Sequence, residues 1–144
     1  MNQPPNPAFA EEIRESFAKQ TIMGLIRAQL SRVEPGIIEI TLPYRADLVQ
    51  QHGYLHAGMV TTIADSACGY AAYSLMPANS EVLSVEFKVN LLRPAKAETF
   101  VAAAEVVKAG KTLTVVRADV FGVDIDDRRE LVATMLATMM CLRK

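Results

Sequence analysis

The stretch HAGMVTTIADSACGYAAYSLM, residues 56–76, decides the fold. It is apolar without the alternation of a strand and longer than a strand, which predicts one helix of about five turns beginning near His56. Small residues lie all around this helix: Ala64, Ser66, Ala67, Cys68, Gly69, Ala71, Ala72 and Ser74. Such a helix can be approached from several sides, which predicts a sheet curled around it. Gly69 costs up to about 1 kcal/mol relative to Ala, and close backbone approach is the expected compensation.

Downstream of this helix the sequence predicts four strands, over residues 80–94, 98–110, 112–124 and 130–142. Leu, Ala and Met in the last segment favour a helix, but its position after a charged turn favours pairing with the preceding strand. The order of elements therefore predicts an α+β domain with one antiparallel sheet.

Upstream of the helix, residues 1–7 read as a loose arm. Phe9, Ile13 and Phe17 then recur every four residues between charged residues, which predicts a short amphipathic helix over about 8–20.

An extended pattern follows over residues 23–33, with a turn at 34–36 and a strand within IIEITLPY, residues 37–44. We divide the chain into an arm and short helix, residues 1–20, and a main domain, residues 21–144.

Composition excludes several classes of protein. A net charge of −1, with Lys and Arg scattered along the 144 residues, offers no source for nucleic-acid binding. Cys68 and Cys141 are far apart and have no metal-ligand spacing, which predicts a reduced, cytoplasmic protein without a metal or redox cofactor. No signal peptide is recognisable, and no window reaches the ~18–20 apolar residues of a membrane span.

Three segments, GYLHAGMVTTIADSACGYAA, SVEFKVNLLRPA and KAGKTLTVVRADVF, resemble the PaaI-type hotdog-fold acyl-CoA thioesterases of the 4-hydroxybenzoyl-CoA thioesterase-like superfamily. The family motif places Gly before His-Gly-Gly, and Asp after six further residues; the matching residues are Gly53, His56, Ala57, Gly58 and Asp65. The resemblance runs from about residue 20 to the C-terminus. It implies a curved antiparallel sheet around one long central helix, acyl-CoA as the substrate, and a homodimer that pairs into a tetramer.

The N–H groups of Ala57 and Gly58 begin the long helix, where unpaired donors and the positive end of the helix dipole favour a developing oxyanion. The resemblance assigns the same duty to this turn, although Ala57 replaces a family Gly. Gln50, with Gln51 beside it, stands where many relatives carry Asn, and its longer side chain changes where it would hold a water.

Asp65 is the expected base or nucleophile. It is the only carboxylate between Asp47 and Glu81, and its apolar surroundings favour a raised pKa unless it is hydrogen-bonded. Bonds to the hydroxyls of Thr61, Thr62 and Ser66 are the alternative. Eight residues separate Ala57 from Asp65, roughly 12 Å along the axis, so a two-fold dimer that shares the site between subunits is expected.

His56 either contacts the thioester carbonyl or, as we favour, fixes the turn through a backbone carbonyl, and His52 is expected at the surface. Ser84 either holds Asp65 or the water, or is an ordinary strand residue. With the resemblance, coenzyme A contacts are expected from Asn90, Arg93, Lys108, Gly110, Lys111 and Thr112. Without it, the last four residues form a generic hairpin.

Three functions compete on these residues. Acyl-CoA hydrolysis assisted by Asp65 is preferred over a non-catalytic acyl-CoA-binding module. Hydration or dehydration is disfavoured because neither His52 nor His56 has the required spacing to an acid. Six apolar residues either line an acyl tunnel or, as is more common, form plain core: Phe9, Phe17, Met23, Leu75, Met76 and Phe87. Medium or long aliphatic chains are preferred over aryl groups as the substrate.

Overall fold

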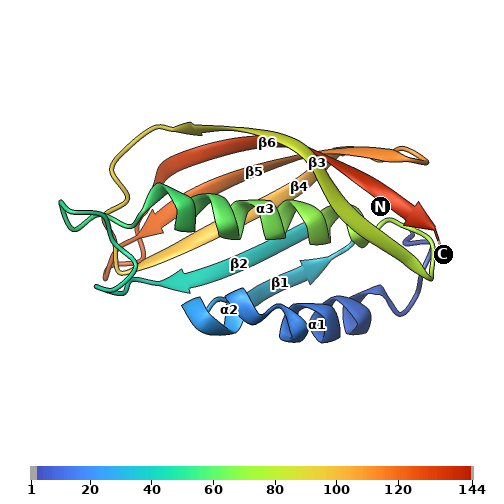
Figure 1. The fold of residues 1–144 in the computed structure, drawn as a ribbon, viewed down its shortest axis with the longest axis horizontal. Coiled ribbons are helices and arrows are strands. Elements are labelled where there is room, and N and C mark those ends of the chain that lie inside the picture. The colour runs from blue at the N-terminus through green and yellow to red at the C-terminus, as the bar shows by residue number, and fades with distance from the viewer. Residues whose placement is uncertain (1–2, 144) are drawn as a thin grey trace.

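A computed structural model describes residues 3–143 as one curved sheet with a long helix, α3 (Ala57–Tyr73), against its concave face (Figure 1). The strands are β1 (Gln29–Glu34), β2 (Ile37–Pro43), β3 (Ser80–Leu91), β4 (Thr99–Lys108), β5 (Leu113–Val123) and β6 (Arg129–Arg143). Neighbouring strands are antiparallel in the order β1-β2-β4-β5-β6-β3. The predicted α+β hotdog architecture is confirmed, as is the strand rather than helix at the C-terminus.

The central helix is packed on several sides, as its small residues predicted. It contacts β2, β3, β4, β5 and β6, and its buried residues include Ile63, Ala67 and Ala71. The helix ends at Tyr73, three residues before the predicted end, and turns carry the chain to Pro77.

The expectation for Gly69 is wrong. A Cβ built on this residue would meet nothing within 4 Å, so no backbone approaches it closely. The glycine instead borders a cavity that is described below.

The N-terminal segment differs from prediction in two places. Residues of the arm are held rather than loose, because Asn6 is 4% exposed and its Nδ2 donates to Glu12 Oε2 at 2.9 Å; residues 1–2 of that arm lie outside the described residues. The expected extended run from residue 23 begins instead with a second helix, α2 (Thr21–Ile26). The helix forms because Met23 and Ile26, one turn apart, both enter the core at 1% exposure.

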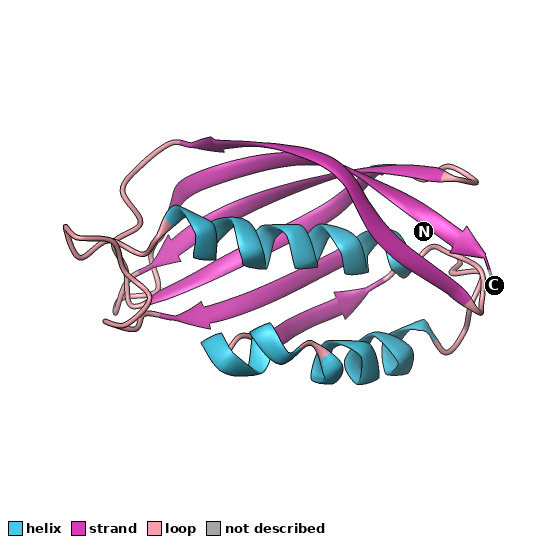
Figure 2. Ribbon diagram, in the orientation of Figure 1, coloured by secondary structure: helices cyan, strands magenta, loops and turns pink. Residues whose placement is uncertain are grey.

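The predicted amphipathic helix is α1 (Phe9–Lys19), which lies beside β1 and α3 with Ile13 in the same core (Figure 2). Strands β1 and β3 are the two edges of the sheet. We find no helix with the length and apolarity of a membrane span among residues 3–143.

Candidate active site

The start of α3 is closed by its own N-cap residue. His56 Nδ1 accepts the N–H of Gly58 at 2.8 Å, so the neutral imidazole carries its proton on Nε2. His56 therefore fixes the turn as favoured above, but it does so through a backbone N–H rather than a carbonyl. The Gly58 N–H, which was expected to act with the Ala57 N–H on an oxyanion, is thus already bonded to His56. A Cβ on Gly58 would approach the His56 ring to 2.9 Å.

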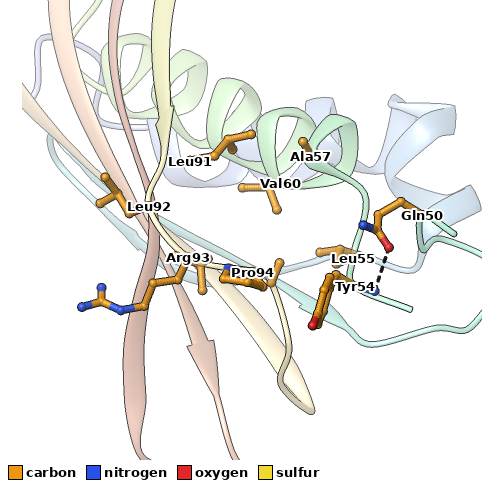
Figure 3. A pocket seen from close by; sticks show the side chains of 11 residues that line it. Gln50, Tyr54, Leu55, Ala57, Val60, Leu91, Leu92, Arg93 and Pro94 are labelled. Carbon is orange, nitrogen blue, oxygen red and sulfur yellow. Dashed lines mark hydrogen bonds between the residues drawn. The ribbon is translucent and has the colours of Figure 1, made fainter. Parts of the chain in front are cut away.

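The Ala57 N–H remains free at this helix terminus. It has no acceptor among residues 3–143, as expected for a first-turn donor. Ala57 lies in the helix and outside the positive-φ residues, so alanine takes the place of glycine without backbone strain. It lines a cleft of about 400 Å³ whose far wall is formed by residues 91–95 (Figure 3).

Gln50 lies in the same cleft and shapes the loop before the helix. Its Oε1 accepts the backbone N–H of His52 at 2.6 Å and of Tyr54 at 3.3 Å. The amide nitrogen points toward the cleft (Figure 3). Gln50 can thus offer the cleft a donor, but its oxygen is committed to the loop. The His52 side chain is exposed, as expected.

Asp65 lies two turns further along α3 and is held from β3. Ser84 Oγ donates to Asp65 Oδ1 at 2.7 Å. Two of the three alternative partners are engaged elsewhere: Thr62 Oγ1 donates to the Gly58 carbonyl at 2.7 Å, and Ser66 Oγ donates to Gln20 at 3.3 Å. Ser84 is therefore placed to orient the carboxylate, with the other Asp65 oxygen available for chemistry.

A second cavity, of about 260 Å³, surrounds Asp65 and is separate from the cleft at Ala57. We call it the Asp65 pocket. Its lining residues are Ser16, Gln20, Asp65, Ser66, Gly69, Tyr70, Val82, Leu83 and Ser84. Sequence reasoning missed Ser16, Gln20 and Tyr70, because no local pattern shows that the end of α1 lies over this face of α3.

Replacing Gly69 by Ala should stabilise the fold. The position is helical and has free space, so the lower backbone entropy of alanine should raise the free energy of unfolding by about 0.5–1 kcal/mol. Urea denaturation of the two proteins measures the difference. A destabilised Gly69→Ala would show that the methyl group displaces a wall of the Asp65 pocket.

Cys68 is one turn beyond Asp65 but is unsuited to act as a nucleophile. Burial, with a contribution from the Asp65 charge, raises the pKa of the Cys68 thiol to about 12. The thiol therefore stays protonated near neutral pH and behaves as a small core residue. Asp65 is the only carboxylate among the residues that line this pocket.

The residues expected to contact coenzyme A lie at two ends of the molecule. Asn90 is exposed and does not line the Ala57 cleft. Its neighbours on β3 pair with the buried Met135 and Ala133 of β6, so Asn90 lies on the sheet face away from α3. Arg93 lines the cleft, yet it is paired with Glu130 at 3.1 Å and donates to the Leu131 carbonyl at 2.9 Å.

The hairpin of Lys108, Gly110, Lys111 and Thr112 is exposed at the tip between β4 and β5. This tip is at the end of the sheet opposite the start of α3 (Figure 1). Within one chain, the structure does not bring these four residues to the Ala57 cleft.

The expected acyl tunnel residues do not line either cavity. Met23 and Met76 are in the core, Phe9 and Phe17 pack against it, Leu75 is half-buried, and Phe87 is exposed on β3. Phe9, Phe17, Met23 and Met76 therefore follow the plain-core alternative.

The chain is similar to known thioesterases and esterases in both sequence and structure. The family model described as thioesterase superfamily matches residues 52–127. A crystal structure of a thioesterase family protein from Silicibacter pomeroyi is 49% identical, with a TM-score of 0.92 over 94% of this chain and 99% of that one. The PaaI protein of the E. coli phenylacetic acid degradation operon shares the fold, with a TM-score of 0.82, 19% identity and 93% of each chain covered. A predicted esterase of Saccharolobus solfataricus is 28% identical over 133 residues, 92% of this chain and 85% of that protein.

The curved sheet around one long helix is the hotdog fold, and the match to thioesterases in sequence and structure supports a thioester hydrolase. The chain belongs to the thioesterase superfamily, and its match to that family confirms the resemblance carried by Gly53, His56, Gly58 and Asp65.

Proposed function

We propose that the protein hydrolyses acyl-CoA thioesters at sites shared between two subunits. The observation that carries this proposal is the separation of the two half-sites. Ala57 and Asp65 are on one helix, roughly 12 Å apart along its axis, and they face different cavities. One thioester carbonyl cannot meet both groups of one chain, but it can meet Ala57 of one subunit and Asp65 of the other.

The edge strand β3 supports this arrangement. It is twelve residues long and exposes Leu83 and Leu91 at 57% and 56%, with Val85 and Phe87 between them also exposed. An apolar edge strand of this length is an aggregation hazard unless another strand covers it. A second copy of β3, antiparallel about a two-fold axis, would cover it symmetrically.

The position of such an axis follows from the two cavities. Residues 82–84 at the start of β3 border the Asp65 pocket, and residues 91–92 at its end border the Ala57 cleft. Antiparallel pairing centred near Phe87 places residues 82–84 of one subunit beside residues 91–92 of the other. We propose that this dimer pairs again into a tetramer.

In the proposed reaction, Asp65 accepts a proton from water while the water oxygen attacks the thioester carbon. Ser84 holds the carboxylate in place. The Ala57 N–H of the other subunit stabilises the oxyanion, aided by the positive end of its helix. The C–S bond then breaks, coenzyme A leaves as a thiolate that takes up a proton, and the free acid is released. Direct attack by Asp65 through an anhydride is the alternative.

The second donor to the carbonyl is assigned to the Gln50 amide. The Gly58 N–H is bonded to His56, whereas Gln50 Nε2 faces the cleft that contains Ala57. We assign Gln50 to the carbonyl rather than to the water because its Oε1 is bonded to the loop and is not free to accept a water proton.

For the nucleotide of coenzyme A, the proposed dimer offers the partner's hairpin at Lys108 and Lys111. An antiparallel pair brings the far end of one subunit toward the near end of the other. Two lysines beside a glycine turn supply charge and N–H groups for phosphate. Arg93 would have to leave Glu130 to take part, so it is the weaker candidate.

A thiol-release assay over short, medium, long and aryl acyl-CoAs tests the proposal. We expect release of free coenzyme A at catalytic rates for at least one class, and a dimer or tetramer by native mass spectrometry. Tight binding of every acyl-CoA without thiol release would instead indicate a binding module, and a monomer would contradict the shared site.

A further inference from the structure

The wall of the Asp65 pocket that faces α1 is built from polar side chains rather than apolar ones. Ser16 and Gln20 come from the end of α1 and its cap, Ser66 and Tyr70 from α3. Tyr70 is 4% exposed, so its hydroxyl is held within the protein. A pocket for a long aliphatic chain would not place buried hydrogen-bonding groups on its wall.

These side chains form one bonded cluster centred on Tyr70. Gln20 Nε2 donates to the Tyr70 hydroxyl at 2.7 Å, and Ser16 Oγ lies 3.1 Å from the same oxygen. Ser66 Oγ donates to Gln20 Oε1 at 3.3 Å, which fixes the orientation of the amide. Gln20 also joins α1 to α2, so the cluster ties the N-terminal helices to the site.

Two hydrogen-bond donors of this wall have no acceptor within the cluster. Ser16 and Tyr70 have two hydroxyl protons and share one hydrogen bond, and no other acceptor for the second proton is found among residues 3–143. Gln20 Nε2 uses one of its two N–H groups on Tyr70. The wall therefore offers an O–H and an N–H to the pocket, and both are satisfied by an oxygen acceptor on the bound group.

The region beyond the wall determines the charge of that acceptor. Ser16, Tyr70 and Val82 also border a neighbouring cavity of about 480 Å³. The charged residues that line this cavity are Glu12, Glu15, Lys19 and Glu81. The two carboxylates of Glu12 and Glu15 outnumber the one ammonium group of Lys19 and oppose a further negative charge at the shared wall. An uncharged oxygen fits, and a distal carboxylate does not.

Helix geometry limits the reach of the acyl group. Tyr70 is five residues after Asp65, roughly 7.5 Å along the axis, and helical side chains lean back toward the N-terminus. An extended chain covers about 3.3–3.6 Å for every three backbone bonds, so the oxygen lies about five or six bonds from the thioester carbon. The pocket of about 260 Å³ agrees with a short group.

We propose that the thioesterase selects short acyl groups that carry an uncharged oxygen acceptor at their distal end, and that Tyr70, set by Gln20 and Ser16, is the residue that selects them. This inference rests on the proposed acyl-CoA hydrolysis at Asp65. It replaces the expectation of medium or long aliphatic chains.

The test compares 5-oxohexanoyl-CoA with 5-methylhexanoyl-CoA, which have the same branching and differ at C5, where a methyl group and a hydrogen replace the carbonyl oxygen. We expect kcat/KM to favour the oxo compound by about tenfold or more, because the unmatched donors reject the methyl group. In Tyr70→Phe this ratio should fall to about one. Tyr73→Phe is the matched control: its hydroxyl donates to Glu12 at 2.7 Å and it does not line the Asp65 pocket, so the ratio should persist.

Gln20→Met provides a second variant that removes the amide donor with little change in shape, and the ratio should fall in it too. A wild-type ratio near one, or a ratio that survives both Tyr70→Phe and Gln20→Met, overturns the inference while hydrolysis itself stands. Absence of hydrolysis for every acyl-CoA would instead remove the proposed function.

Discussion

Asp65→Asn should lower kcat for acyl-CoA hydrolysis by roughly 10²–10⁴-fold, the usual contribution of a positioned general base. Asparagine keeps the size of the side chain, and its oxygen can still accept the Ser84 hydroxyl, which now donates to Asp65 Oδ1 at 2.7 Å. What is lost is the ability to take a proton from water. Steady-state thiol release with saturating substrate measures the change, and melting curves show that the fold persists.

Asp47→Asn is the matched control for this variant. Asp47 is an exposed carboxylate paired with Arg45, away from both cavities, and its substitution should leave turnover unchanged. Hydrolysis by Asp65→Asn within a few-fold of wild type would contradict the assignment.

A single turnover in ¹⁸O-water distinguishes the two roles left open for Asp65. Attack by water on the thioester carbon places ¹⁸O in the acid at once. Attack by Asp65, followed by attack of water on the aspartyl carbon of the anhydride, gives a first acid that contains a carboxylate oxygen from the protein and leaves ¹⁸O in Asp65. The distinction is independent of how much activity the asparagine variant loses.

The central helix and its sheet were predictable because their causes are local. Small residues on all sides of residues 57–73 require a partner on all sides, and the strands after Pro77 carry their own turns. The motif predicted that Ala57 and Asp65 lie on one helix. Because eight helical residues separate them, it also predicted that one chain could not bring both groups to the same carbonyl.

The missed features depend on contacts between distant segments. The second helix at 21–26 forms because Met23 and Ile26 reach the core, and an extended reading fits the same residues. The engagement of Gly58 by His56 depends on one ring orientation that the motif does not specify. The wall at Tyr70 requires Gln20, fifty residues away, and no periodicity connects the two.

Ala57→Pro should remove the oxyanion donor while leaving the helix intact. Proline is favoured at the first helical position, where its missing N–H has no partner within the helix. His56 precedes it with ψ 136°, the extended conformation that a residue before proline adopts. We expect kcat to fall by about 10²–10³-fold, the cost of losing one oxyanion donor, with the melting temperature little changed.

Ala57→Gly is the matched control, since it keeps the N–H and restores the family residue, and we expect it to remain active. An active Ala57→Pro would show that this N–H does not contact the developing oxyanion. The assignment of the oxyanion donors would then pass to Gln50 alone.

Mixing the two inactive variants tests whether the site is shared. A dimer of one Asp65→Asn subunit and one Ala57→Pro subunit contains one site with both lesions and one with neither, if each site takes Ala57 from one chain and Asp65 from the other. The purified mixed dimer should then retain about half of wild-type activity, since one of its two sites is intact. If each site were built from a single chain, every site in the mixture would carry one lesion and no activity would return. Co-expression with two affinity tags, followed by thiol-release assays on the purified mixed dimer, measures the outcome.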